Sequence, residues 1–256
     1  MNRTDLAHEI ASESGLSVEE TILGGMKITR VVIDERAGEK AKKPKGAYIT
    51  LHCHEKPQKN ESTVLCQVLA KMLSEFKSEK VLVTGLGNNN ITPDSLGVRT
   101  AARILATAHF KSLRDFAELG LREVYTIEPG VMAQTGLESA EQLRFVADGI
   151  KPDCLIVIDS LACNERERLA RTIQVTDSGI APGSGVKNER KEFSAKTFNV
   201  PVIAIGVPTV MDWDGFMVVP KDIDSIISRY TKTISSAVNH ALNPNLDDEE
   251  IESLLQ

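Results

Sequence analysis

Hydrophobic residues follow two spacings along the chain, and together these predict alternating helices and strands. In residues 62–76 (STVLCQVLAKMLSEF) apolar side chains recur at helical spacing from Val64 to Leu73, which indicates a helix with one buried face. Residues 220–242 repeat this amphipathic pattern over a longer stretch, and residues 138–150 predict a further helix. These three segments are the main helices of the predicted fold.

Continuous apolar runs mark the expected strands. Residues 80–85 and 153–159 are of this kind, which is typical of the central strands of a parallel sheet. Further strands are expected at 121–127, 171–177 and 200–206. Because strands alternate with helices, the chain is predicted to adopt an α/β fold with a mainly parallel sheet sandwiched by helices.

The N-terminal part of the chain has a different pattern. Residues 26–34 and 46–53 predict an antiparallel β-hairpin at the edge of the sheet. Binding sites in α/β sheets lie beyond the carboxyl ends of the strands. The loops after Thr84, Ile158 and Val175 are therefore the candidate site loops.

The chain shows no internal repeat and no clear linker, so residues 16–243 are predicted to form a single domain. Residues 1–15 are polar and are expected to form an N-terminal arm, with a short helix around Leu6–Glu13. Residues 244–256 are acidic, and we expect this C-terminal tail to be loosely held.

Charge and composition exclude several classes of protein. The 256 residues carry a net charge of −6 and only 4% aromatic residues, which argues against nucleic-acid binding. No apolar run reaches the length of a membrane span, and the N-terminus lacks the apolar core of a signal peptide, so we expect a cytoplasmic protein that contacts no membrane. The scattered cysteines are expected to be reduced thiols: Cys53, Cys66, Cys154 and Cys163.

The stretch GLGNNNITPDSLG, at residues 85–97, joins an expected strand to an expected helix. A glycine-rich turn at such a place often binds phosphate, but the carboxylate of Asp94 would repel one. Thr92 is expected to be the helix N-cap and Pro93 the first helical residue, which places Asp94 in the first turn. On spacing alone, Asp94 would only complement the helix dipole.

A second carboxylate changes this interpretation. Asp159 ends a buried apolar run, where a carboxylate is costly unless it is paired or used, although it could also cap the following turn. Asp94 and Asp159 lie on expected neighbouring strand ends and could face one cleft. There, one ionised and one protonated carboxyl group can share a proton and activate a water molecule.

Three other motifs carry weaker signals. The triplet DSG at 177–179 matches ordinary aspartic proteases, but those are all-β proteins. The stretch GSGVK at 183–187 lacks the spacing of a phosphate-binding loop. His52 and His54 share one face of an expected strand, but further metal ligands are not evident, so no metal site is predicted.

Long segments of the chain resemble the spore germination protease family in order and spacing: GLGNNNITPDSLG, EPGVMAQTGLESAE, KPDCLIVIDSLAC, TIQVTDSGIAPGSGVKNERKEFS and VPVIAIGVPTVMD. The resemblance covers nearly the whole chain. It implies an atypical aspartic endopeptidase that degrades small acid-soluble spore proteins in the cytoplasm of the germinating spore. It also implies a self-processing zymogen, a homotetramer, no cofactor and a fold like that of hydrogenase maturation proteases.

The resemblance assigns the catalytic pair to Asp94 and Asp159 and not to the DSG aspartate. We expect Asp94 to be ionised near the helix start and the buried Asp159 to hold the proton. Gly87 permits a sharp turn off the strand, and backbone amides near Asn88 are expected to bind a substrate carbonyl.

The resemblance also suggests where the chain cuts itself, because the family cleaves after Glu in an acidic–aliphatic–Ala–x–Glu pattern. This pattern occurs twice in DLAHEIASE, which makes Asp5 and Glu9 the candidate autocleavage residues and residues 1–15 a short pro-segment. A basic pocket for acidic substrates is expected from Lys187, Arg190 and Lys191, although these residues could equally form a solvated helix start.

The chain is shorter than the family pattern between Asp212 and Phe216, which puts the quaternary structure in question. Two alternative functions stay open at this point. One is a metal-dependent peptidase of the hydrogenase-maturation type. The other is a non-enzymatic module that binds a nucleotide or a peptide through GLGN and GSGVK.

Overall fold

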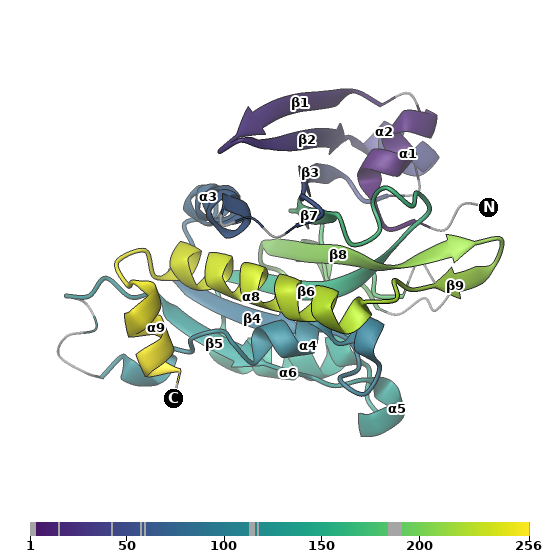
Figure 1. Cartoon of the computed structure of the whole chain (residues 1–256). Coiled ribbons are helices and arrows are strands. Elements are labelled where there is room, and N and C mark those ends of the chain that lie inside the picture. Colours follow the sequence, from purple (N-terminus) through teal and green to yellow (C-terminus); the bar gives the residue numbers. More distant parts are fainter. Residues whose placement is uncertain are drawn as a thin grey trace.

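The computed structural model describes residues 4–14, 16–41, 43–56, 58, 60–112, 116, 118–183 and 191–255. The described residues form one nine-stranded mixed sheet in the order β1-β2-β3-β7-β8-β6-β4-β5, with β9 paired to β8 (Figure 1). The strands are β1 (Val18–Leu23), β2 (Met26–Ile33), β3 (Gly46–His52), β4 (Lys80–Gly85), β5 (Glu123–Ile127), β6 (Cys154–Cys163), β7 (Thr172–Thr176), β8 (Val202–Trp213) and β9 (Phe216–Val218).

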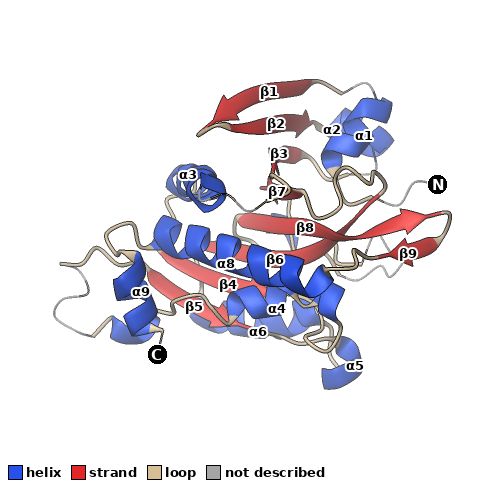
Figure 2. Ribbon diagram, viewed as in Figure 1, coloured by secondary structure: helices blue, strands red, loops and turns tan. Residues whose placement is uncertain are grey.

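Helices cover both faces of this sheet. They are α1 (Ala7–Ser14), α2 (Glu35–Ala41), α3 (Asn60–Glu75), η1 (Thr92–Asp94), α4 (Leu96–Ala101), η2 (Ala108–Phe110), α5 (Met132–Thr135), α6 (Ser139–Ile150), α7 (Ala195–Phe198), α8 (Ile223–Leu242) and α9 (Asp248–Leu254). The apolar stripes of α3 and α8 pack on one face, where α8 crosses the strands in Figure 2. Helix α6 packs on the other face through Leu143 and Ala147. The predicted helical layers are therefore confirmed.

Four strands form the parallel half of the sheet, in the order β5-β4-β6-β8. Strand β4 stops at Gly85, opposite Ile158, whereas β6 continues to Cys163 alongside β8. The apolar run suggested that the strand ends at Asp159. In the structure, Asp159 lies inside β6, which continues to Cys163. The carboxylate still faces a cleft because β4, the neighbouring strand, has already ended.

The other half of the sheet is antiparallel. Strands β2 and β3 form the predicted antiparallel pair, and α2 lies between them in the chain. The edge is formed by β1, which the sequence did not reveal because most of its residues are exposed. Strand β7 runs antiparallel to β8, so the loop after Val175 starts from the opposite edge to the loops after β4 and β6. The α/β class is confirmed, and the sheet is mixed.

Both terminal segments pack onto the domain. Leu6, Ala7 and Ala11 are buried, so α1 is held against the sheet instead of hanging free. In the C-terminal tail, Ile251 of α9 is buried in a small apolar cluster, and a capping box starts the helix. The expectation of a loosely held acidic tail is wrong, because its apolar residues recur at helical spacing. No helix in the described ranges is long and apolar enough to cross a membrane.

Candidate active site

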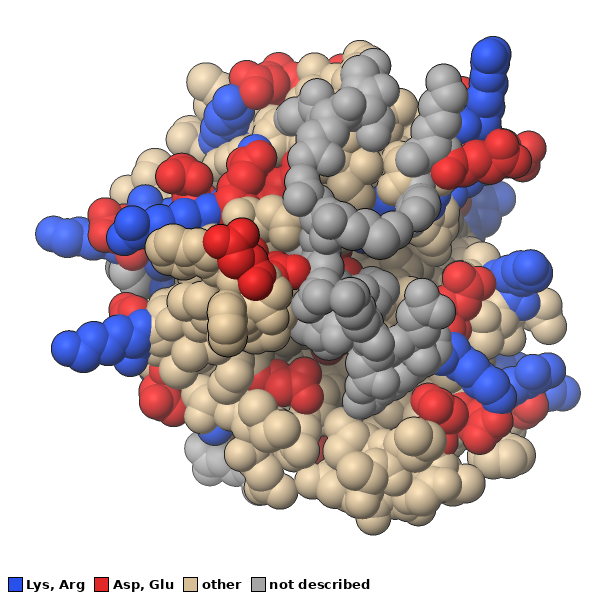
Figure 3. Space-filling model, turned by 90° about the vertical axis from the view of Figure 1, so that its right-hand side faces the viewer, with Lys and Arg blue, Asp and Glu red and all other residues tan. Residues whose placement is uncertain are grey.

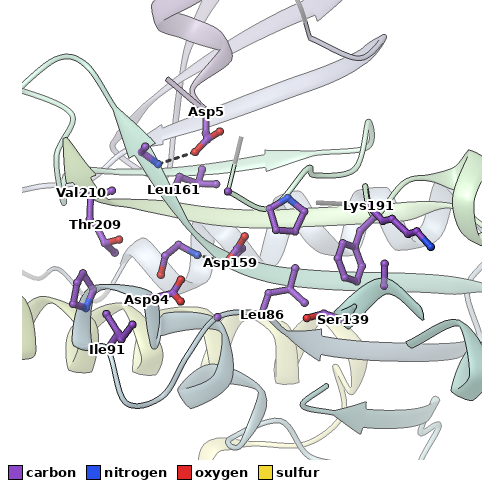
Figure 4. Close-up of a pocket in the computed structure, with 18 of the residues that line it drawn as sticks. Asp5, Leu86, Ile91, Asp94, Ser139, Asp159, Leu161, Lys191, Thr209 and Val210 are labelled. Carbon is purple, nitrogen blue, oxygen red and sulfur yellow. Dashed lines mark hydrogen bonds between the residues drawn. The ribbon is translucent and has the colours of Figure 1, made fainter. Parts of the chain in front are cut away.

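A cleft of about 290 Å³ opens where β4 ends beside β6. Its walls come from the glycine turn and η1, the carboxyl halves of β6 and β8, the start of α6 and the N-terminal segment. Several polar residues line it, among them Asp5, Asp94, Asp159, Ser160, Lys191 and Thr209. Figure 4 shows the side chains of Asp94 and Asp159 near one another in this cavity, on two different segments of the chain.

Asp94 is held by the glycine turn. The backbone N–H of Asn88 donates to Asp94 Oδ2 at 2.9 Å and to the Asp94 carbonyl at 3.0 Å. Gly87 has φ +109°, and a Cβ there would lie 1.9 Å from the Asp94 carbonyl oxygen. The turn can therefore close on Asp94 only with glycine at this position.

The local helix start differs from its prediction. Asp94 ends the short 3-10 turn η1, and Ile91, not Thr92, occupies the N-cap position without a side-chain cap. The following helix, α4, has only six residues. Asp94 is therefore oriented by the Asn88 amide and not by a long helix.

Asp159 comes from β6 and is 5% exposed. Its Oδ1 accepts a hydrogen bond of 2.8 Å from the backbone N–H of Ser160. The expected convergence of Asp94 and Asp159 on one cleft is thus present in the structure. Two carboxyl groups in a partly buried cleft are a suitable arrangement for acid–base chemistry on a bound water.

Only some of the predicted substrate-binding residues line the cleft. Gly87 and Lys191 line the cleft, and Lys191 Nζ pairs with Glu141 at its rim. Asn88 is not among the residues that line the cleft. Its side-chain oxygen accepts hydrogen bonds from the backbone N–H of Asn90 and from Gln134 Nε2. Lys187 and Arg190 lie outside the described residues.

Asp5, predicted only as a cleavage residue, lies in the wall of the cleft. Its N–H donates to the Ala162 carbonyl at 2.9 Å, and its Oδ2 accepts from Ala162 N–H at 2.8 Å (Figure 4). The Asp5 carbonyl accepts from Lys43 Nζ at 3.1 Å and from Gln174 Nε2 at 3.2 Å. The N-terminal segment is thus hydrogen-bonded to β6 beyond the end of β4.

Glu9, the other candidate cleavage residue, does not line the cleft. It is 5% exposed on α1, and its carboxylate accepts hydrogen bonds from the backbone amides of Asn164 and Glu165. Burial raises the pKa of Glu9 above its usual range. The peptide bond after Glu9 lies inside a helix and is not extended as a substrate would be.

A second cavity of about 110 Å³ adjoins the cleft and shares Asp5 and Leu161 with it. Lys43 lines this cavity, and burial of its amine lowers its pKa although the residue as a whole is partly exposed. Gln174 also lines it, and its Oε1 accepts from Ala7 N–H at 2.8 Å. No motif in the sequence pointed to Lys43 or Gln174.

Two hydroxyl groups of the cleft also escaped sequence analysis. The side-chain oxygens of Ser160 and Thr209 are buried in the cleft wall, and neither has a hydrogen-bond partner among the described residues. The adjacency of Ser160 to Asp159 was the one available signal. By contrast, Asp177 of the DSG triplet lies away from the cleft, where its Oδ1 accepts from Ala47 N–H at 2.7 Å.

Charged residues of both signs lie on the face of the molecule drawn in Figure 3. Figure 3 shows Lys, Arg, Asp and Glu interspersed over the part of the surface that is described. Within that part, no group of three or more His, Cys, Asp or Glu residues is arranged to hold a metal ion. The ring of His52 instead pairs with Thr29 Oγ1 at 3.2 Å.

Known proteins resemble this chain over most of its length. A solved structure, the [NiFe] hydrogenase maturation protease HycI from Thermococcus kodakarensis, has a TM-score of 0.42 and 17% identity, covering 68% of this chain and 98% of that one. The germination protease from Caldanaerobacter subterraneus subsp. tengcongensis is 38% identical, covering 99% of this chain and 98% of the relative. That from Clostridium tetani is 36% identical, covering 99% of each chain. The germination protease family model matches residues 2–216, and the chain therefore belongs to this family of peptidases.

Proposed function

We propose that Asp94 and Asp159 are the catalytic pair of this germination protease family member. One observation carries the proposal. Two carboxyl groups from different elements, η1 and β6, line the same partly buried cleft at the point where β4 ends. A peptide bond placed between them would lie within reach of both an acid and a base.

The pair would hydrolyse the bond through an attacking water. Asp94 takes one proton from the water as the water oxygen bonds to the scissile carbonyl carbon, and Asp159 gives its proton to the carbonyl oxygen. The tetrahedral intermediate then collapses. Asp94 protonates the leaving nitrogen as the C–N bond breaks, and Asp159 recovers a proton from one hydroxyl of the intermediate.

The surroundings of the two carboxyl groups support this division of roles. Asp159 is 5% exposed, and burial favours the neutral form of a carboxyl group. Each carboxyl group accepts one backbone N–H, from Asn88 or from Ser160, so the difference between them is exposure: Asp94 is partly exposed, which favours its anion. Lys191, with Lys187 and Arg190 of the adjoining sequence, would attract acidic substrate side chains, and Gly87 lines the same cleft.

The substrates that we propose are small acid-soluble spore proteins, cut in the cytoplasm of the spore. The family membership supports this assignment. We also propose that the chain assembles as a homotetramer. The β8–β9 hairpin supports an association surface, because Trp213 and Phe216 are 60% and 76% exposed at its tip.

Self-processing is proposed at the bond after Asp5 in preference to the bond after Glu9. Asp5 precedes α1 and lines the same cleft as the proposed catalytic pair, whereas Glu9 lies within α1. A helical segment must unfold before a protease can bind it in extended form. The N-terminal segment would thus be the first substrate of the site.

The catalytic pair is tested by Asp94→Asn and Asp159→Asn, assayed on a small acid-soluble spore protein with mass spectrometry of the fragments. Each change should lower cleavage at least ~100-fold while the thermal midpoint stays close to that of the unchanged protein. Asp177→Asn is the matched control and should keep most of the activity. Near-normal cleavage by either folded cleft variant would refute the pair.

The two alternative functions have their own tests. A metal-dependent peptidase would lose activity in a chelator and regain it with a metal ion, and metal analysis would detect the ion. A nucleotide-binding module would retain nucleotides in equilibrium dialysis and would release no peptide fragments. We expect chelator-resistant cleavage and no nucleotide retention.

A further inference from the structure

Strand β8 contains a bulge beside the catalytic cleft. Leu161 of β6 pairs with Pro208, but the next residue, Ala162, pairs with Val210, so Thr209 is the extra residue of β8. A bulge interrupts the alternation of a strand and redirects its side chains. Here Thr209 and Val210, although consecutive, both line the cleft.

The side chain of Thr209 is unusual for a buried residue. It is 1% exposed and lines the cleft that holds Asp94 and Asp159, and its Oγ1 has no hydrogen-bond partner in the part of the chain that the structure describes. An unpaired buried hydroxyl costs stability, and such groups in native proteins need a reason. Figure 4 shows Thr209 on the same side of the cavity as Asp94.

Thr209 could be a buried hydroxyl that has no hydrogen-bond partner and no function. Thr231 of α8 is an example, because it is 6% exposed and its Oγ1 is also unpaired. Thr231, however, lines neither of the two cavities described above. Thr209 differs from Thr231 because it lies on a bulge and lines the cleft.

We propose that the Thr209 hydroxyl holds the attacking water against Asp94. The water donates one hydrogen to the Asp94 carboxylate and the other to Thr209 Oγ1, so a lone pair is left to attack the scissile carbonyl carbon. Thr209 neither gains nor loses a proton in this step. A buried water needs two to four polar partners, and the cleft supplies them through Asp94, Thr209 and Ser160.

The assignment rests on the proposed catalytic pair, and the test separates the two. Thr209→Val keeps the shape of the side chain and removes only the hydroxyl. We expect kcat to fall at least ~10-fold with little change in KM, since the lost contact acts on water and not on substrate. The thermal midpoint should stay the same or rise, because an unpaired buried group has been removed.

Three further variants complete the experiment. Thr231→Val removes the matched buried hydroxyl and should leave kcat unchanged. Thr209→Ser keeps the hydroxyl and should recover most of the activity, and it serves as the second variant if Thr209→Val does not fold. Asp94→Asn reports independently on the catalytic pair.

A folded Thr209→Val protein with unchanged kcat overturns the proposal, whatever Asp94→Asn shows. Equal losses in Thr209→Val and Thr231→Val would also overturn it, since the effect would then be structural. A loss of kcat in Ser160→Ala without one in Thr209→Val would assign the water to Ser160 and refute Thr209. If Asp94→Asn is active, the catalytic pair fails on its own evidence, and the mechanism for Thr209 fails with it.

Discussion

At the scale of single residues, the site depends on how closely the glycine turn approaches Asp94. Gly87 combines a positive φ with the 1.9 Å separation between a would-be Cβ and the Asp94 carbonyl oxygen. Gly87→Ala should therefore cost about 1–2 kcal/mol in backbone strain and should also displace Asp94. We expect a lower thermal midpoint together with a large loss of kcat in the peptide-cleavage assay.

Gly136 is the matched control for this prediction. It also has a positive φ, +75°, but nothing lies within 4 Å of a would-be Cβ. Gly136→Ala should thus show the backbone cost and retain its activity. Equal kinetic losses in the two variants would show that the contact between Gly87 and Asp94 is not what positions the carboxylate.

At the scale of elements, we expect the contact between α1 and β3 to respond to pH. His8 of α1 and His52 of β3 pack edge to face, with ring centroids 5.8 Å apart. Burial, and then the nearby Arg168, lower the pKa of each histidine from 6.5 to about 4, while Glu20 acts in the opposite direction. The unfolded chain then binds more protons than the folded one between these two values.

The free energy of unfolding should therefore hold above about pH 6.5 and decline as the pH falls towards 4. Glu9, whose pKa is raised by burial, acts with the opposite sign. His52→Gln isolates the histidine, because Glu9 is present in both proteins. Urea unfolding across this range should show a pH slope smaller by up to about one proton. An unchanged slope would exclude His52 as a titrating group.

The C-terminal helix α9 should contribute to stability without affecting catalysis. Ile251 is 5% exposed and packs in one cluster with Leu105 and Leu246. Ile251→Ala should lower the free energy of unfolding by about 2 kcal/mol and leave kcat unchanged, because α9 lies outside the cleft. Leu254, 42% exposed in the same helix, gives the control, since Leu254→Ala should change stability by less than about 0.5 kcal/mol.

At the scale of the whole molecule, the N-terminal segment forms part of the wall of the proposed catalytic cleft through Asp5. Asp5 is held by Ala162, Lys43 and Gln174 across the boundary of the two cavities. We predict that the purified protein acquires a new N-terminus at Leu6. Mass spectrometry under conditions where spore proteins are cut would detect the fragment.

Asp94→Asn is the control for this processing, because it should keep the intact N-terminus. Cleavage that persists in that variant would point to a contaminating protease. An intact terminus in the unchanged protein, while it degrades its substrate, would show that processing is not required for activity. A new N-terminus at Ile10 would favour the bond after Glu9 and would require α1 to unfold first.

The chain is shorter than its relatives, and the turn between β8 and β9 lies where we expect the difference. The alignment with the Caldanaerobacter relative spans 320 positions, more than the 256 residues present here. Sequence analysis placed the shortening between Asp212 and Phe216. There the structure has a tight turn at Asp214 and Gly215, both with positive φ, that joins β8 directly to β9. A compact hairpin thus stands where we expect the relatives to carry additional residues.

The sequence by itself determined the class of fold, the main helices and the two candidate aspartates. These follow from local properties of the chain, such as helical spacing in 62–76, apolar runs at 80–85 and 153–159, and the positions of Asp94 within the glycine-rich stretch and of Asp159 at the end of the second run. The same local patterns wrongly predicted Thr92 as the helix N-cap and a loosely held acidic tail. Caps and terminal helices depend on what packs against them.

Only the tertiary structure decided how these parts become a site. Asp94 and Asp159 converge because β4 stops at Gly85 while β6 continues, a difference in length between strands that belong to distant parts of the sequence. The bulge at Thr209 arises from the pairing of β8 with β6. Asp5 is likewise held by a hydrogen bond to Ala162 of β6, far from it in the chain. Register and bulges are properties of a pair of segments, so neither segment alone can encode them.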